Sequence, residues 1–93
     1  KHVHKGTIEN AYTILNGEFE VIEAEIIDSS ELINKELKNS NLPDDIRIGA
    51  ILRKDDVIIP TSKFIFEKKD IVVFLAKRDQ LTLVERLFQI SSI

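Results

Sequence analysis

The sequence predicts an α+β domain, with a small mixed or antiparallel sheet of about five to six strands and two helices. Short apolar runs with a period of two recur along the chain, as expected of strands that bury one face. Turn residues separate these runs, and only two segments have the apolar spacing of a helix. The expected order is strand, strand, helix, strand, strand, strand, helix.

Composition limits the chain to one domain. Its 93 residues are 43% apolar and 31% charged, which is typical of a folded globular protein. No cysteine is present, so disulfides and thiolate metal sites are excluded. The net charge of −3 and the lack of a basic cluster argue against nucleic-acid binding. No apolar run approaches the roughly 18 residues of a membrane-spanning helix.

The chain reads as a piece of a longer polypeptide, because it begins with Lys1 rather than methionine. We assign residues 1–93 to a single domain and expect residues 1–6 to be a flexible start. His2 and His4 lie in that start. Two imidazoles without a fixed third ligand make a poor zinc site, so we predict no metal.

A hairpin is predicted next, with arms at 7–15 and 19–27. Asn16-Gly17 lies between the arms and favours a tight turn, because both turn positions need positive φ. In the second arm the even-numbered residues Ile22, Ala24 and Ile26 form a core face, and Glu23 and Glu25 point the other way. That opposite face is either solvated or meets a polar partner.

The first helix is predicted after Asp28-Ser29-Ser30, whose oxygen atoms suit the capping of a helix start. Leu32, Ile33 and Leu37 give this helix a short apolar stripe. Asn34 is expected to adopt a left-handed conformation that ends or distorts it. Leu42-Pro43 then imposes an extended conformation before the next strand.

Strands are predicted at 46–53, 57–59 and 71–76, with a brief alternating segment at 64–66. Pro60 ends the second of these strands because it lacks an amide donor. The run 71–76 is apolar throughout, so we expect it to be the most buried strand. Asp79 is suited to cap a final helix, whose apolar residues at helical spacing are Leu81, Val84, Leu87 and Phe88.

The chain lacks the patterns of an enzyme. Its serines lie in capping or loop positions with no histidine nearby, so none has a base to activate it. Its glycines are too far apart for a dinucleotide-binding fingerprint or a phosphate-binding loop. An acidic ribbon suits a solvated face better than a cation site; its members are Glu18, Glu20, Glu23 and Glu25. We therefore predict no catalytic residues and no cofactor within this chain.

Arg47 and Arg53 are predicted to share one face of the strand 46–53, with the small Gly49 between them. Glycine in a strand leaves room for a ligand or another backbone to approach closely. Arginine beside such a gap could hold a phosphate or carboxylate through two parallel hydrogen bonds. The alternative is that both arginines are exposed and pair with the acidic strand.

Several motifs follow one another at a characteristic spacing: Val3-His-Lys-Gly6, Leu15-Asn-Gly-Glu-Phe-Glu-Val-Ile-Glu23, Ser30-x-Leu32-x-x-Lys35-x-Leu37, Leu42-Pro43, Ile48-x-Ala50-Ile51-x-Arg53, Pro60 and Asp70-x-Val72-Val73. Together they resemble the C-terminal domain of Trk-type regulators of potassium conductance, also called the RCK C-terminal domain. The family commonly has glycine at the position of Asn34, and often a glycine where Lys54-Asp55 stands here.

The resemblance implies a regulatory, ligand-sensing homodimer that controls a membrane potassium-transport subunit. Such a domain would be cytoplasmic and peripheral to the inner face of the membrane. An upstream Rossmann-type domain of the same polypeptide would hold NAD or ATP. In some relatives a cyclic dinucleotide or another small effector binds at the dimer interface. Carried over to this chain, the ligand-binding residues would be Asn41, Leu42, Pro43, Ile46, Arg47, Ile48 and Pro60.

Two alternatives stay open. The same type of domain could be attached to another transporter, such as a cation/proton antiporter or a dicarboxylate permease. It could also be a dimerisation module that binds no ligand. An upstream dinucleotide fingerprint would favour the potassium regulator, and upstream transmembrane spans would favour the antiporter.

Overall fold

The structure is a computed structural model and describes residues 7–89. Predictions for the flexible start and for its two histidines lie outside the described residues. The elements are β1 (Thr7–Ile14), β2 (Phe19–Glu25), β3 (Ile46–Arg53), β4 (Asp56–Ile58), β5 (Ile71–Lys77) and α1 (Leu81–Phe88), with short 3-10 turns at Leu15–Gly17, Leu37–Asn39 and Arg78–Gln80. The α+β class is confirmed, with five strands in the described part and one α-helix.

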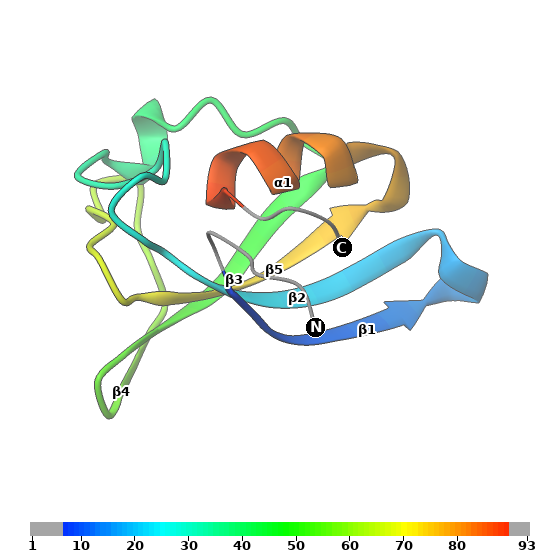
Figure 1. Cartoon of the computed structure of the whole chain (residues 1–93), viewed down its shortest axis with the longest axis horizontal. Coiled ribbons are helices and arrows are strands. Elements are labelled where there is room, and N and C mark those ends of the chain that lie inside the picture. Colours follow the sequence, from blue (N-terminus) through cyan, green and yellow to red (C-terminus); the bar gives the residue numbers. More distant parts are fainter. Residues whose placement is uncertain (1–6, 90–93) are drawn as a thin grey trace.

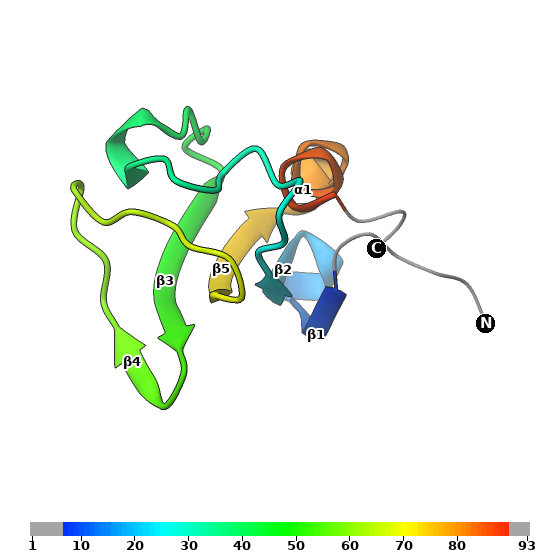
Figure 2. The ribbon, with the colours of Figure 1, turned by 60° about the vertical axis from the view of Figure 1, so that its left-hand side comes forward.

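The strands form a single antiparallel sheet in the order β1-β2-β5-β3-β4. The helix α1 and the long segment between β2 and β3 lie over one face of this sheet, and the β3–β4 hairpin extends away from the helix (Figures 1 and 2). The core fills the space between these layers. Its largest side chains include Phe66, Phe74, Ile22 and Leu32, and the rings of Phe74 and Phe88 stack with their centroids 5.1 Å apart.

The β1–β2 hairpin confirms the prediction from Asn16-Gly17. Both residues have positive φ, 57° for Asn16 and 87° for Gly17. Along β2, Ile22 and Ala24 are fully buried, and the residues between them face the other side of the sheet. The central strand β5 alternates between buried and half-buried residues.

The first predicted helix is wrong. Ser30 does accept a hydrogen bond from the Leu32 amide at 3.1 Å, as a capping residue would, but the chain makes only turns there. Asn34 is left-handed, with φ 63°, and stops the turn as expected. The backbone then runs extended, because the Leu37 amide donates to the Phe64 carbonyl at 2.7 Å. Pairing with 62–66 replaces the hydrogen bonds that a helix would make.

The segment 64–66 is not a strand. It forms one isolated bridge, between Ile65 and Glu36, so a sixth strand is absent from the described part of the chain. The final helix is confirmed, with Val84, Leu87 and Phe88 buried. Asp79 does not cap it, because the helix begins after Gln80 and no side chain caps its start. No helix within 7–89 is long and apolar enough to cross a membrane.

The predicted faces of β3 are wrong beyond Gly49, because a β-bulge lies between Ile48 and Ala50. Ile48 pairs with Phe74, whereas Ala50 pairs with Val73, so the alternation shifts by one residue at Gly49. An extra residue in one strand reverses which side chains face the core beyond it. Arg47 and Arg53 therefore lie on opposite faces of the sheet, not on one face as predicted.

Candidate functional site

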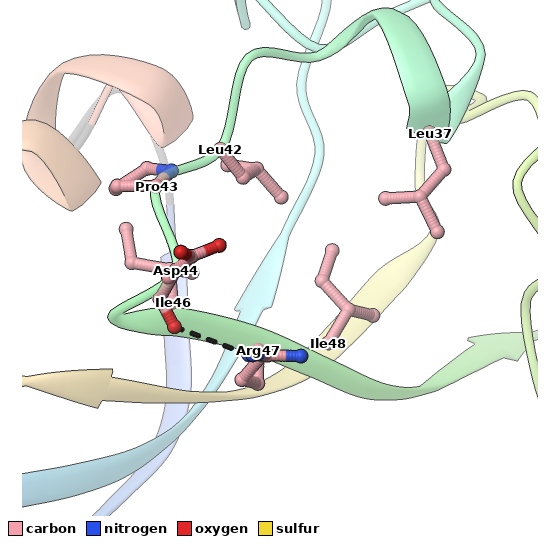
Figure 3. Close-up of a pocket in the computed structure, with 7 residues that line it drawn as sticks. All are labelled: Leu37, Leu42, Pro43, Asp44, Ile46, Arg47 and Ile48. Atoms are coloured by element: carbon pink, nitrogen blue, oxygen red, sulfur yellow. Dashed lines mark hydrogen bonds between the residues drawn. The ribbon is translucent and has the colours of Figure 1, made fainter.

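A hollow of about 270 Å³ lies beside the first half of β3. Its lining residues are Leu37, Leu42, Pro43, Asp44, Ile46, Arg47 and Ile48. The side chains of Leu37, Leu42 and Ile48 converge from three segments, and Arg47 lies at the side of the hollow (Figure 3). The walls are therefore mainly aliphatic, with one cationic side chain at the rim.

Hydrogen bonds to backbone carbonyls hold the turn that forms this hollow. The Ser40 hydroxyl donates to the Leu37 carbonyl at 2.6 Å and closes the 3-10 turn. The Ile46 amide donates to the Pro43 carbonyl at 3.0 Å, and the Asp45 carbonyl accepts from the Lys77 amide at 2.9 Å. The last bond ties the turn to the end of the central strand β5. The hollow is thus preformed by the backbone rather than by side-chain packing alone.

Arg47 is the cationic residue that lines the hollow, and Asp44 is the acidic one. The Arg47 side chain is exposed, and Nε donates to the Asp44 carbonyl at 3.1 Å. Its two terminal amino groups have no partner within the described residues. A planar guanidinium with free donors suits a phosphate or carboxylate, and aliphatic walls suit the face of a ring. The cationic and aliphatic groups of the hollow suit a small anionic ligand.

The structure brings together most of the residues predicted for ligand binding. Leu42, Pro43, Ile46, Arg47 and Ile48 line the hollow. Asn41 and Pro60 do not; Asn41 is exposed in a left-handed conformation, with φ 57°.

Leu37 and Asp44 line the hollow but were absent from the predicted set. Asp44 had a signal in the sequence, because it lies within the predicted run of site residues. Leu37 had none that was specific, because its apolar character fits the predicted helix stripe equally well.

Arg53, at the other end of β3, belongs to a closed cluster. Its Nε and one terminal amino group donate to the two carboxylate oxygens of Asp70, at 2.8 and 2.7 Å. The same amino group donates to the Ile65 carbonyl at 3.0 Å, and the guanidinium carbon lies 4.9 Å from the Phe64 ring centre. The hydrogen bonds to Asp70 raise the pKa of the Arg53 guanidinium. With its donors engaged, this arginine has a structural role.

The predicted acidic ribbon does not form one surface. Glu20 is buried on the core face and lies 4.0 Å from Arg78, whereas Glu23 and Glu25 lie on the opposite face. Among residues 7–89 no group of three potential ligands is placed to hold a metal ion.

The family model described as TrkA-C domain matches residues 21–89, which include the whole hollow. The chain belongs to the TrkA-C domain family. This TrkA-C domain is similar to the Trk system potassium uptake protein TrkA of Azorhizobium caulinodans, with 35% identity over 91 residues, 98% of this chain and 20% of the relative.

Two further relatives bear related names. The TrkA protein of Haemophilus influenzae is 36% identical over 95 residues, 98% of this chain and 21% of the relative. A TrkA homolog of Archaeoglobus fulgidus is 33% identical over 64 residues, 69% of this chain and 15% of the relative. The TrkA-C domain described here spans about a fifth or less of the length of these curated relatives.

Proposed function

We propose that this TrkA-C domain regulates a Trk-type potassium-uptake system by binding a small anionic effector in the hollow beside β3. The observation that carries the proposal is the pairing of aliphatic walls with the free donors of Arg47. The relatives support the transport context, because they are named as Trk system potassium uptake proteins. The domain itself is proposed to sense and transmit, not to catalyse.

A cyclic dinucleotide fits this chemistry. One of its phosphates would accept hydrogen bonds from Arg47, and a base would lie against Leu37 and Ile48. The hollow, at about 270 Å³, is slightly smaller than the roughly 300–1,000 Å³ of most small-molecule pockets. That size suits half of a symmetric ligand, with a second copy of the domain supplying the other half.

The remaining parts of the proposal concern the whole assembly. The domain acts as a homodimer in the cytoplasm and reports effector state to a membrane potassium-transport subunit. An upstream Rossmann-type domain of the same polypeptide would hold NAD or ATP. Effector binding changes channel activity only if the effector has different affinities for two arrangements of the dimer.

Thermal unfolding tests the effector site directly. The chain would be melted with cyclic di-AMP, ATP, ADP, NADH or potassium chloride. A ligand at about 100 times its dissociation constant adds roughly 2.7 kcal/mol, which raises the midpoint by about 4–8 °C in a domain of this size. We expect one nucleotide to do so selectively. Arg47→Ala should abolish the rise.

Arg86→Ala is the matched control, because it removes the same charge from the exposed side of α1. It should leave the ligand-induced rise unchanged. A flat response to every nucleotide would contradict the effector site and favour a dimerisation module without a ligand. An equal loss of response in Arg47→Ala and Arg86→Ala would point to non-specific charge effects.

A further inference from the structure

The two edge strands of the sheet, β1 and β4, differ in how open they are to pairing with a further strand. β4 has three residues, Lys54 lies in the turn before it, and Pro60 follows it closely. Short length, lysine and proline are features by which proteins keep an edge strand from pairing with another chain. β1 has eight residues and contains neither proline nor lysine. β1 is therefore the edge that is left open.

The outer edge of β1 presents a regular stretch of backbone. The inner edge pairs with β2, and no other strand in the described part of the chain lies beside β1 (Figure 1). In an antiparallel pair, alternate residues direct their N–H and C=O groups away from the neighbouring strand. The register shifts between Ile8 and Asn10, and the pairing is continuous from Asn10 to Ile14. At about 3.4 Å per residue, this stretch offers roughly 17 Å to a further strand.

Three consecutive side chains on this stretch are exposed, those of Tyr12, Thr13 and Ile14. Tyr12 and Ile14 lie on one face of the sheet, opposite Val21 and Phe19, and Thr13 lies on the other face. An added strand with apolar residues at alternate positions would cover Tyr12 and Ile14. The hydroxyl groups of tyrosine and threonine also bind water, which suits an edge that is uncovered when its partner is absent.

The hairpin that carries this edge is acidic. From the start of β1 to the end of β2 the sequence has five glutamates and no lysine or arginine. Glu18 lies in the turn after β1, and Glu23 and Glu25 lie opposite its first half. Glu20 differs from these because it is buried and lies 4.0 Å from Arg78. The negative charge favours a basic partner strand, and it opposes pairing between the β1 edges of two copies, because like charges would approach each other.

We propose that the outer edge of β1 binds an extended basic segment of another polypeptide, which adds a sixth strand to the sheet. Backbone hydrogen bonds along Asn10–Ile14 would supply the binding, and alternate apolar residues of the segment would contact Tyr12 and Ile14. A lysine or arginine near each end of the segment would meet the glutamates. The hollow beside β3 is separate from this edge, because β2 and β5 lie between, a distance of about 14 Å from β1 to β3.

Fluorescence polarisation with a labelled ten-residue peptide tests the edge. In this peptide valine alternates with threonine, and a lysine stands at each end. We expect saturable binding to the chain. Methylation of the central peptide amides should abolish the binding, because it removes the backbone donors but keeps the charge and the apolar side chains. Equal binding of the methylated peptide would mean charge attraction alone and would overturn the added strand.

Tyr12→Lys should weaken peptide binding at least about tenfold, because it places a positive charge on the edge that faces a basic strand. Val57→Lys is the matched control, because it makes the same kind of change on the other edge strand, β4. Both side chains are more than half exposed, 59% for Tyr12 and 68% for Val57, so both variants should keep their fold by circular dichroism. Equal affinities in the two variants would overturn the proposal.

Amide hydrogen exchange locates the bound peptide. Exchange of the outward-facing amides within Asn10–Ile14 should slow, and exchange in β4 should stay unchanged. Protection of β4 instead, or of neither edge, would overturn the proposal. Concentration-dependent protection of β1 without peptide would assign the edge to a second copy and would overturn the basic partner. Arg47→Ala should bind the peptide as the wild type does, so a peptide-binding chain that binds no nucleotide would overturn the effector site alone.

Discussion

The two arginines of β3 have opposite environments. Arg53 donates to both oxygens of a carboxylate that is 2% exposed, and it also contacts a carbonyl and a ring. Within residues 7–89 the Arg47 side chain makes one hydrogen bond, to the carbonyl of a residue three positions away. The bulge at Gly49 separates them by sending the two side chains to opposite faces.

The difference teaches how to recognise an arginine that is available for binding. The donors of Arg53 are engaged by Asp70 and by a backbone carbonyl, so this side chain stabilises the fold. The terminal donors of Arg47 have no partner within the described residues and lie beside an aliphatic hollow. Neither residue type nor strand position distinguishes the two. We therefore expect substitutions of Arg53 to lower the free energy of unfolding and substitutions of Arg47 to leave it nearly unchanged.

The largest effect is expected from Asp70→Asn. The substitution removes the buried negative charge that pairs with Arg53. It also weakens the hydrogen bond that the residue 70 side chain accepts from the Glu67 amide, which is 2.8 Å long in the wild type. Breaking one partner of a buried pair costs about 3–5 kcal/mol, and because Arg53 is partly exposed we expect about 3 kcal/mol. Urea denaturation measures the loss. Asp28→Asn, which breaks the exposed pair with Lys68, should cost less than about 0.5 kcal/mol.

A smaller effect is expected from Arg53→Lys. Lysine keeps the charge but loses the two parallel hydrogen bonds to Asp70, so the unfolding free energy should fall by about 1–2 kcal/mol. Arg47→Lys is the matched change at the other end of β3 and should shift it by less than about 0.5 kcal/mol. Equal losses in the two variants would contradict the contrast between the arginines.

The smallest effect is expected from alkaline pH. The hydrogen bonds to Asp70 raise the pKa of Arg53. The contribution of Arg53 to the free energy of unfolding is therefore fully present below its unfolded-state pKa and is lost as the pH rises through its folded-state pKa. Both values lie above the working range of most buffers. The difference in unfolding free energy between wild type and Arg53→Leu should therefore stay constant from about pH 7 to about pH 11. A difference that declines across this range would contradict the assignment.

Much of the fold could be predicted because the signals are local. Asn16-Gly17 specifies the first turn through the φ values of two residues, and the apolar runs of β3, β5 and α1 have clear periods. The grouping of the candidate-site residues around one hollow could be predicted where they are contiguous in the chain. The run from Leu42 to Ile48 forms one turn and the start of one strand, so its members necessarily lie together.

The larger errors involve partners distant in sequence. The predicted helix after Ser30 is absent because 62–66 takes its backbone donors, and no local pattern signals that pairing. The bulge at Gly49 adds one residue to β3, which reverses the face of Arg53 without disturbing the visible alternation. Asp70 was read as the start of a strand, whereas it is the buried acceptor for an arginine 17 positions away.

The bond from the Leu37 amide to the Phe64 carbonyl stiffens one wall of the hollow beside β3. Phe64 and Ile65 are the residues that Arg53 contacts, so the wall that carries Leu37 is attached to the Arg53–Asp70 pair. We therefore expect this wall to keep its position when a ligand binds, so that chiefly the Arg47 side chain reorients. Because few groups would lose conformational freedom, the proposed anionic effector would bind there with a small entropic penalty.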